Sequence, residues 1–229
     1  MGAIPSPRVL RVDVLELYDY DELRRTREAT MFVVNVERAT LVLGGSQPFD
    51  VLNRDGLKAM PLRRRRGGGG LVLLQPGDLW IDWWIPSDDA RWSKDVNVSS
   101  INVGRWWLQV LSERVTGKIT VHEGPMQGDP AHRPVCFAGR GPGEVFVDDR
   151  KAVGVTQWRV REGVFVSSVL PARLSTQILQ YLADVPAGLD VALDHHVLSA
   201  LFDGEPVEII DRLRAVSGPW FDHVITFSD

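Results

Sequence analysis

The sequence lacks the features that mark secreted and membrane-spanning proteins. Its 229 residues include a single cysteine, Cys136, so no internal disulfide can form and a reducing compartment is expected. It has no uninterrupted run of about eighteen apolar residues, as a transmembrane helix needs. Its first residues do not combine a charged stretch, an apolar core and a small-residue cleavage site, as secretory signals do. These absences predict a cytoplasmic protein with no membrane partner.

The sequence also lacks an excess of basic charge. It carries 26 Lys and Arg against 30 Asp and Glu, which gives a formal net charge of −4. A mildly acidic chain is repelled by the phosphate backbone, so no nucleic-acid partner is expected. The dense basic run that does occur, Arg63–Arg66, therefore needs a local explanation.

Short β-branched and apolar segments separated by turn residues fill most of the chain, and each predicts a strand. Hydrophobic residues make up 44% of the sequence, enough for a sizeable core. The predicted strands are Arg8–Leu17, Met31–Val36, Thr40–Leu43, Leu71–Leu74, Leu79–Ile85, Val135–Ala138, Glu144–Val147, Ala152–Arg161 and Val164–Leu170.

Helical patterns occur between these strands and dominate the end of the chain. One or two helical turns are predicted at Asp21–Glu28. A long helix should begin at Asn97–Ser100 and end near Gly117, with Ile101, Leu108, Leu111 and Val115 on its apolar face. Further helices are predicted at Ser175–Leu182, Asp190–Leu201 and Glu205–Val216. We therefore predict an α+β fold, a mixed and largely antiparallel sheet flanked by helices, with residues 1–172 as the main domain and 173–229 as a small helical segment packed on it.

The run of arginines and glycines at Arg64–Gly70 is the most distinctive local feature. Consecutive glycines let the backbone approach a ligand closely, and their N–H groups can converge on an anion. Arginines add forked donors suited to phosphate or carboxylate. A flexible basic linker is the alternative, but the run lies between Leu62 and the predicted strand Leu71–Leu74. This position favours anion binding.

The segment Arg64–Val72 resembles the Arg-Arg-x-small-Gly-Gly-Gly-x-Val signature of lipoate-protein ligases and the related octanoyltransferases. Thr40–Gly44 is similar to the strand that precedes this signature in the family. Val135–Arg140 and Asp149–Arg159 resemble its second and third sequence blocks, in the right order. The resemblance implies the catalytic domain of the biotin and lipoate protein ligases for residues 1–172.

The resemblance also implies the chemistry. Such a ligase uses ATP with magnesium to convert lipoate or octanoate into an acyl-adenylate, then acylates a lysine of a lipoyl carrier domain. Lys151 matches the family lysine beside the phosphate or acyl carbonyl, whereas the local sequence alone suggests a solvated lysine after Asp148-Asp149. The matching substrate and nucleotide contacts are Arg64, Arg65, Gly67, Gly68, Gly69, Gly70, Val72, Arg140, Gly154 and Gln157, and no resident metal is implied.

Two alternatives remain open. Cys136-Phe137 lies fifteen residues before Lys151, as the nucleophilic cysteine does in some octanoyltransferases, which take their acyl group from acyl carrier protein without ATP. In a second transferase branch the cysteine position corresponds to Val164, which excludes that branch.

The other alternative is a non-catalytic binding member of the family. Leu74-Gln75 and Ser167-Ser168 replace the family's His-Asp and His-Gly pairs, and Asp21–Thr30 is a shortened counterpart of its N-terminal helix. Trp80 and Trp158 are candidates for lining an acyl tunnel, and Trp83-Trp84 and Trp106-Trp107 for the core.

Overall fold

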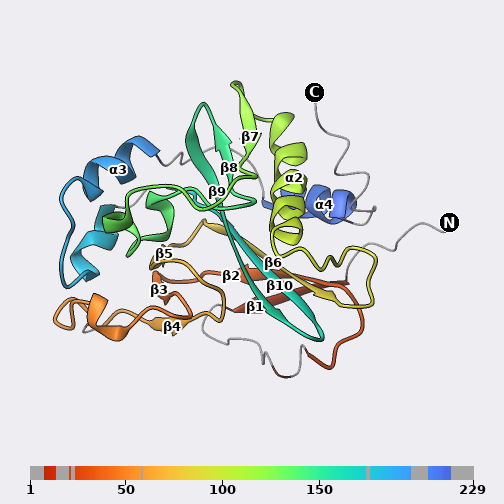
Figure 1. Cartoon of the computed structure of the whole chain (residues 1–229), viewed down its shortest axis with the longest axis horizontal. Coiled ribbons are helices and arrows are strands. Elements are labelled where there is room, and N and C mark those ends of the chain that lie inside the picture. The colour runs from red at the N-terminus through yellow and green to blue at the C-terminus, as the bar shows by residue number, and fades with distance from the viewer. Residues whose placement is uncertain are drawn as a thin grey trace.

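Seven of the strands that the structure describes form one twisted sheet (Figure 1). The computed structural model describes residues 8–13, 21, 24–57, 59–173, 176–196 and 206–217. In spatial order the strands are β1 (Arg8–Asp13), β2 (Thr30–Asn35), β6 (Leu79–Pro86), β10 (Gly163–Leu170), β9 (Arg150–Val160), β8 (Val145–Val147) and β7 (Ile119–Val121). β1 and β2 are parallel and the other neighbours antiparallel, which confirms the predicted fold class.

A second sheet of three short strands carries the arginine run. Its order is β4 (Leu62–Arg64), β3 (Thr40–Leu43) and β5 (Val72–Leu74), with β4 parallel and β5 antiparallel to β3. β4 was not among the predicted strands, because its alternating pattern is hidden by consecutive arginines. The four glycines that follow, Gly67–Gly70 (the glycine segment), therefore connect two strands that both pair with β3.

The long helix α2 (Val98–Ser112) packs on the main sheet through its tryptophans. Leu111 is buried as predicted, but Ile101 and Leu108 are only half-buried. The core-facing residues are Val103, Trp106, Trp107, Val110 and Leu111, and the half-buried Val115 packs against the same core. The predicted face was therefore right at Leu111 and Val115 and wrong at Ile101 and Leu108. The helix also ends at Ser112, well before the predicted cap at Gly117. The expectation that Trp83-Trp84 and Trp106-Trp107 lie in the core is confirmed, since all four are almost fully buried.

The segment predicted as a strand at Val135–Ala138 is a 3-10 turn, η3 (Cys136–Ala138). Val135 makes only an isolated parallel bridge to Leu71. Leu71 donates to the Pro134 carbonyl at 2.7 Å and Cys136 donates to the Leu71 carbonyl at 3.0 Å. These two bonds attach the start of η3 to the end of the glycine segment. After them the chain forms a 3-10 turn and, among the described residues, makes no further strand pairing there.

The C-terminal elements pack at two separate places. η4 (Thr176–Tyr181) and α3 (Leu189–His196) cover the small sheet, with Ile178, Leu189 and Leu193 in its cluster. α4 (Pro206–Ser217) packs on α2 at the other side of the molecule (Figure 1), and its Ile209 and Leu213 belong to the main core. The predicted helix Ser175–Leu182 is thus a 3-10 turn. The predicted elements Arg8–Leu17 and Asp190–Leu201 end outside the described residues. Of Asp21–Glu28, residues 21 and 24–28 are described, and 24–28 are not helical. The division at residue 172 stays a prediction. In the parts of the chain that are described, no helix has the length and apolarity to cross a bilayer.

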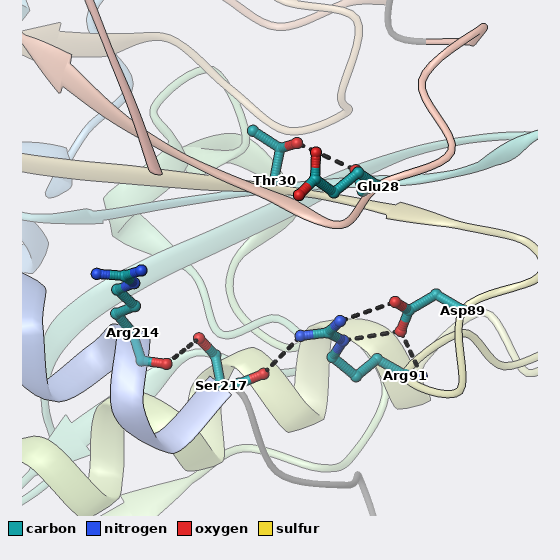
Figure 2. A network of polar contacts seen from close by, with 6 residues as sticks. All are labelled: Glu28, Thr30, Asp89, Arg91, Arg214 and Ser217. Carbon is teal, nitrogen blue, oxygen red and sulfur yellow. Dashed lines mark hydrogen bonds and ion pairs between the residues drawn. The ribbon is translucent and has the colours of Figure 1, made fainter. Parts of the chain in front are cut away.

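A buried arginine fixes the end of α4 (Figure 2). Arg91 pairs with Asp89 through two bonds, Nε to Oδ1 at 2.7 Å and Nη2 to Oδ2 at 2.8 Å. Its Nη1 donates to the carbonyl of Ser217, the last residue of α4, at 3.0 Å. The guanidinium thereby supplies a charged donor to an orphan carbonyl at the helix C-terminus.

We expect Arg91→Met to lower the free energy of unfolding by about 2–3 kcal/mol, because it leaves the partly buried Asp89 carboxylate and a helix carbonyl without their charged donor. Arg212→Met is the matched control, since Arg212 links α4 to Glu113 of the segment after α2 through an exposed ion pair. Its loss should cost below about 1 kcal/mol. Urea unfolding of the two variants gives the comparison, and equal losses would contradict the assigned role of Arg91.

Candidate active site

Two cavities meet beside η3. The first is a narrow apolar pocket of about 30 Å³ between the small sheet and strands β9 and β10. The second is a polar cavity of about 530 Å³, lined by the glycine segment, the start of α2 and the loop before η3. Cys136, Val155 and Thr156 line both, so the pocket and the cavity share a wall.

The arginines before the glycine segment bind backbone rather than facing the polar cavity. Arg65 is buried, and its Nη2 donates to the carbonyls of Gly68 at 2.8 Å and Gly70 at 2.7 Å. Arg64 donates to the carbonyls of Gly44 at 3.0 Å and Gln47 at 2.6 Å. Arg65 also lines the apolar pocket. Arg65 therefore holds the glycine segment and Arg64 holds the loop after β3, and their predicted contact with an anionic ligand stays a prediction.

The glycines of this segment are not equivalent. A Cβ on Gly70 would lie 2.5 Å from the Arg133 carbonyl oxygen and 2.8 Å from the Cys136 amide, which is too close. Gly69 has a φ of +92°, in the left-handed region that favours glycine. A Cβ on Gly67 would lie 2.9 Å from Thr156 Oγ1, whereas one on Gly68 would have no neighbour within 4 Å. Close approach to the η3 segment is thus required mainly at Gly70. Val72, which follows the segment, is buried and lines the apolar pocket.

Lys151 is buried behind the residues that line the site, with 1% of its surface exposed. Its Nζ lies 2.7 Å from Glu144 Oε2 and donates to the Cys136 carbonyl at 3.1 Å. It also lies 5.4 Å from the centre of the Phe137 ring, within range of a cation–π contact. The interpretation of Lys151 as a solvated hairpin lysine is therefore wrong. Its neighbour Arg150 takes the exposed position instead, since successive side chains of a strand point to opposite faces.

Glu144 is the residue that sequence reasoning missed. It is 3% exposed, lines the polar cavity, and accepts the Gly141 N–H on Oε2 at 2.6 Å. Burial raises the pKa of Glu144, while the charge of Lys151 and backbone N–H groups of Gly141 and Val155 act in the opposite direction. The sequence feature that could have pointed to Glu144 is its place as an acidic residue at the start of an apolar strand, seven positions before Lys151.

The remaining predicted site residues divide between the cavities and the surface. Gly154 lines the apolar pocket and faces the Phe137 ring. Gln157 lines the polar cavity; its Nε2 donates to the Val96 carbonyl, and its buried Oε1 has no hydrogen-bond partner among the described residues. Arg140 instead binds the hairpin, donating to the Asp149 carbonyl at 2.8 Å.

The two tryptophans proposed to line an acyl tunnel lie in different places, and so do the residues that replace the family's His-Asp and His-Gly pairs. Trp80 lines the apolar pocket, whereas Trp158 stacks under Arg66 with 5.0 Å between guanidinium and ring centre. Leu74 and Ser167, at two of the departing positions, line the apolar pocket as well. Ser168 is used in the core, where it accepts the Trp107 indole N–H at 2.8 Å.

Asp78, in the turn after β5, has a raised pKa. Asp78 accepts the backbone N–H groups of Gln75 at 2.7 Å and Ala172 at 2.9 Å. Burial nevertheless raises the pKa of Asp78 to about 6, from an ordinary value of 3.8. Because the folded state holds the proton more tightly, this contribution to stability is complete below the ordinary pKa and is lost as the pH rises towards 6.

We therefore expect the free energy of unfolding to fall by roughly 1–2 kcal/mol between pH 4 and 7 through Asp78, allowing for its partial exposure. Asp78→Asn should lack this part of the pH dependence. Urea unfolding at several pH values measures both, and an identical slope in the variant would contradict the assignment.

The fold is shared with lipoate-protein ligases of known structure. A lipoate-protein ligase A solved with ATP superposes with a TM-score of 0.68 at 16% identity, over 96% of this chain and 85% of that chain. The bipartite lipoate protein ligase of Thermoplasma acidophilum gives 0.70 and 16%, over 96% and 84%. LipL1 of P. falciparum, solved with lipoate, gives 0.61 and 15%, over 92% and 61%.

No family model and no curated protein matches the sequence itself. At 15–16% identity the likeness establishes a common fold. The sequence resemblance to the lipoate-protein ligase superfamily is thereby confirmed at the level of the fold.

Proposed function

We propose that the chain is a ligase of the lipoate-protein ligase type, which activates lipoate or octanoate with ATP and transfers the acyl group to a lysine of a lipoyl carrier domain. The observation that carries this proposal is the burial of Lys151 against Glu144 and the Cys136 carbonyl, two residues that line the cavities. The shared fold supports it, since solved proteins of that fold carry ATP or lipoate.

The chemistry assigns one part of the substrate to each cavity. The apolar pocket suits an acyl chain, although its 30 Å³ must widen to admit one. The polar cavity, at about 530 Å³, is within the usual range for a small-molecule site and suits a nucleotide. The acyl carboxyl group would then lie at the shared wall. A cation beside it stabilises the charge that develops when the carboxylate attacks phosphorus, and again when the carrier amine attacks the acyl-adenylate.

Intact mass of a carrier domain tests the proposal. The protein is incubated with ATP, magnesium, an apo lipoyl domain and a mixture of lipoate, octanoate and biotin. We expect a single acyl adduct on the carrier, dependent on ATP and absent with Lys151→Ala. The proposal fails if no adduct forms with any of the three acids.

Cys136 favours a second candidate, an ATP-independent octanoyltransferase. The residue is half-buried and lines both cavities. A Cβ on Gly69 would lie 3.4 Å from its Sγ, which places the sulfur against the glycine segment. In this reaction the thiolate attacks the octanoyl thioester of acyl carrier protein, a new C–S bond forms, and the carrier thiol leaves. The lysine amine of the acceptor then attacks the acyl group, and the Cys136 thiol is released.

The two candidates differ in their donor. Incubation with octanoyl-acyl carrier protein and no ATP should leave an octanoyl group on Cys136, detectable by peptide mass spectrometry. Full activity of Cys136→Ser would exclude this route and leave the ligase. Calorimetric binding of octanoate without transfer from either donor would instead support a non-catalytic member of the family, the third alternative from the sequence.

A further inference from the structure

Glu144 and Lys151 form an ion pair that is almost completely removed from water. Their side chains are 3% and 1% exposed, and Glu144 Oε2 lies 2.7 Å from Lys151 Nζ. Moving two charges out of water is costly, and the attraction between them repays this only with good geometry and further hydrogen bonds. A pair retained at such a place therefore invites a functional explanation beyond stability.

The carboxylate is fixed by the backbone around it. Glu144 Oε2 accepts the Gly141 N–H at 2.6 Å, and the Glu144 N–H donates to the Gly141 carbonyl at 3.1 Å, so the two residues close a tight turn. The backbone N–H of Val155 in β9 counteracts the effect of burial on the pKa of Glu144, as the Gly141 N–H does. Few side-chain torsions are left free, so the carboxylate acts as a rigid reference point.

The lysine side chain is held at two of its three donors. The ammonium group has three N–H bonds. One is directed to Glu144 and a second to the Cys136 carbonyl at 3.1 Å. A lysine has a flexible four-carbon stem, and these two anchors fix the direction of the third N–H. Glu144 lines the polar cavity and Cys136 lines both cavities, so the anchored ammonium lies directly behind residues that line the site.

We propose that Glu144 is the positioning residue of Lys151, holding its ammonium group at the wall where the acyl carbonyl reacts. This inference rests on the proposed function for its catalytic consequence, but the positioning itself is a property of the free protein. Glu144 acts through Lys151 and needs no contact with the substrate.

The side-chain NMR spectrum of the lysines tests the positioning without any enzyme assay. The chain has only four lysines, so a ¹⁵N-lysine spectrum is simple to read. In the wild type we expect one ammonium signal protected from exchange with water, identified by its loss in Lys151→Met. Glu144→Ala should abolish this protection. Glu144→Asp keeps the charge but is one methylene shorter, and it should abolish the protection too. It replaces the alanine variant if that variant does not fold.

Glu123→Gln is the control, since Glu123 is paired with Arg105 in an exposed bridge. Persistence of the protected signal in Glu144→Asp overturns the proposal.

Carrier acylation then tests the consequence. We expect Glu144→Asp to lower kcat about 100-fold with little change in the KM for octanoate, because a misplaced catalytic group loses transition-state contact. In a Lys151→Met background the same change should have no further effect on kcat. A further loss in that background, or a change confined to KM, contradicts positioning through Lys151. If the wild type acylates no carrier, the proposed function fails, while the NMR result still decides whether Glu144 holds Lys151.

Discussion

Replacing Lys151 with methionine should reduce carrier acylation by about 10²–10³-fold or more, the usual cost of deleting one electrostatic contact to the transition state. The same substitution should lower the free energy of unfolding by about 3–5 kcal/mol, because Glu144 is left as a buried charge without its partner. The rate of acylation measured by intact mass, together with urea unfolding, gives both quantities.

Two controls separate these effects. Arg150→Met changes the exposed neighbour in the same strand and should alter neither activity nor stability. The double variant Lys151→Met with Glu144→Gln should recover much of the lost stability, since no buried charge remains, but none of the activity. Activity within tenfold of the wild type in Lys151→Met would contradict the catalytic role that the proposed function gives to Lys151.

The glycine segment should respond to alanine at one position and tolerate it two residues earlier. Gly70→Ala places a methyl group against backbone atoms of Arg133, Pro134 and Cys136, at 2.5–2.8 Å. The contact can be relieved only by moving η3 away from the glycine segment. We expect a loss of about 1–3 kcal/mol in stability, as for other overpacked sites, and a loss of acylation of about 100-fold through displaced site groups.

Gly68→Ala is the matched change, because the position faces open space and its φ is not in the left-handed region. It should fold with wild-type stability, and any effect on activity reports direct contact of the new methyl group with the ligand. Thermal unfolding and acylation rates of Gly70→Ala and Gly68→Ala test both expectations. Equal destabilisation by both would show that the segment is sensitive as a whole, contrary to the geometry.

The sequence predicted which segments form the candidate site but not how its charges are used. Periodicity found most strands, and the motif resemblance placed the glycine segment and Lys151. It could not show that Arg64 bonds the carbonyls of Gly44 and Gln47, because those residues come from a chain segment that only the fold brings beside it. Burial of Lys151 likewise depends on Glu144. A charged residue looks solvated in its local sequence until the opposite charge is placed beside it.

The errors in secondary structure have equally specific causes. In α2 the prediction followed the aliphatic residues, whereas the tryptophans, with their larger apolar area, decided which face is buried. At Val135–Ala138 the apolar run fitted a strand. The bonds between Leu71, Pro134 and Cys136 anchor only its beginning, so a turn follows.

The placement of the last helices has a consequence for how the protein is made. Ile209 and Leu213 of α4 complete the main core, and α3 packs directly on η3, the element that carries Cys136. Neither contact can form until residues 189–217 have left the ribosome. The sheet must therefore wait partly uncovered during synthesis, with apolar surface open to chaperones or to aggregation. The support of η3 by α3 likewise has to wait until α3 has been made.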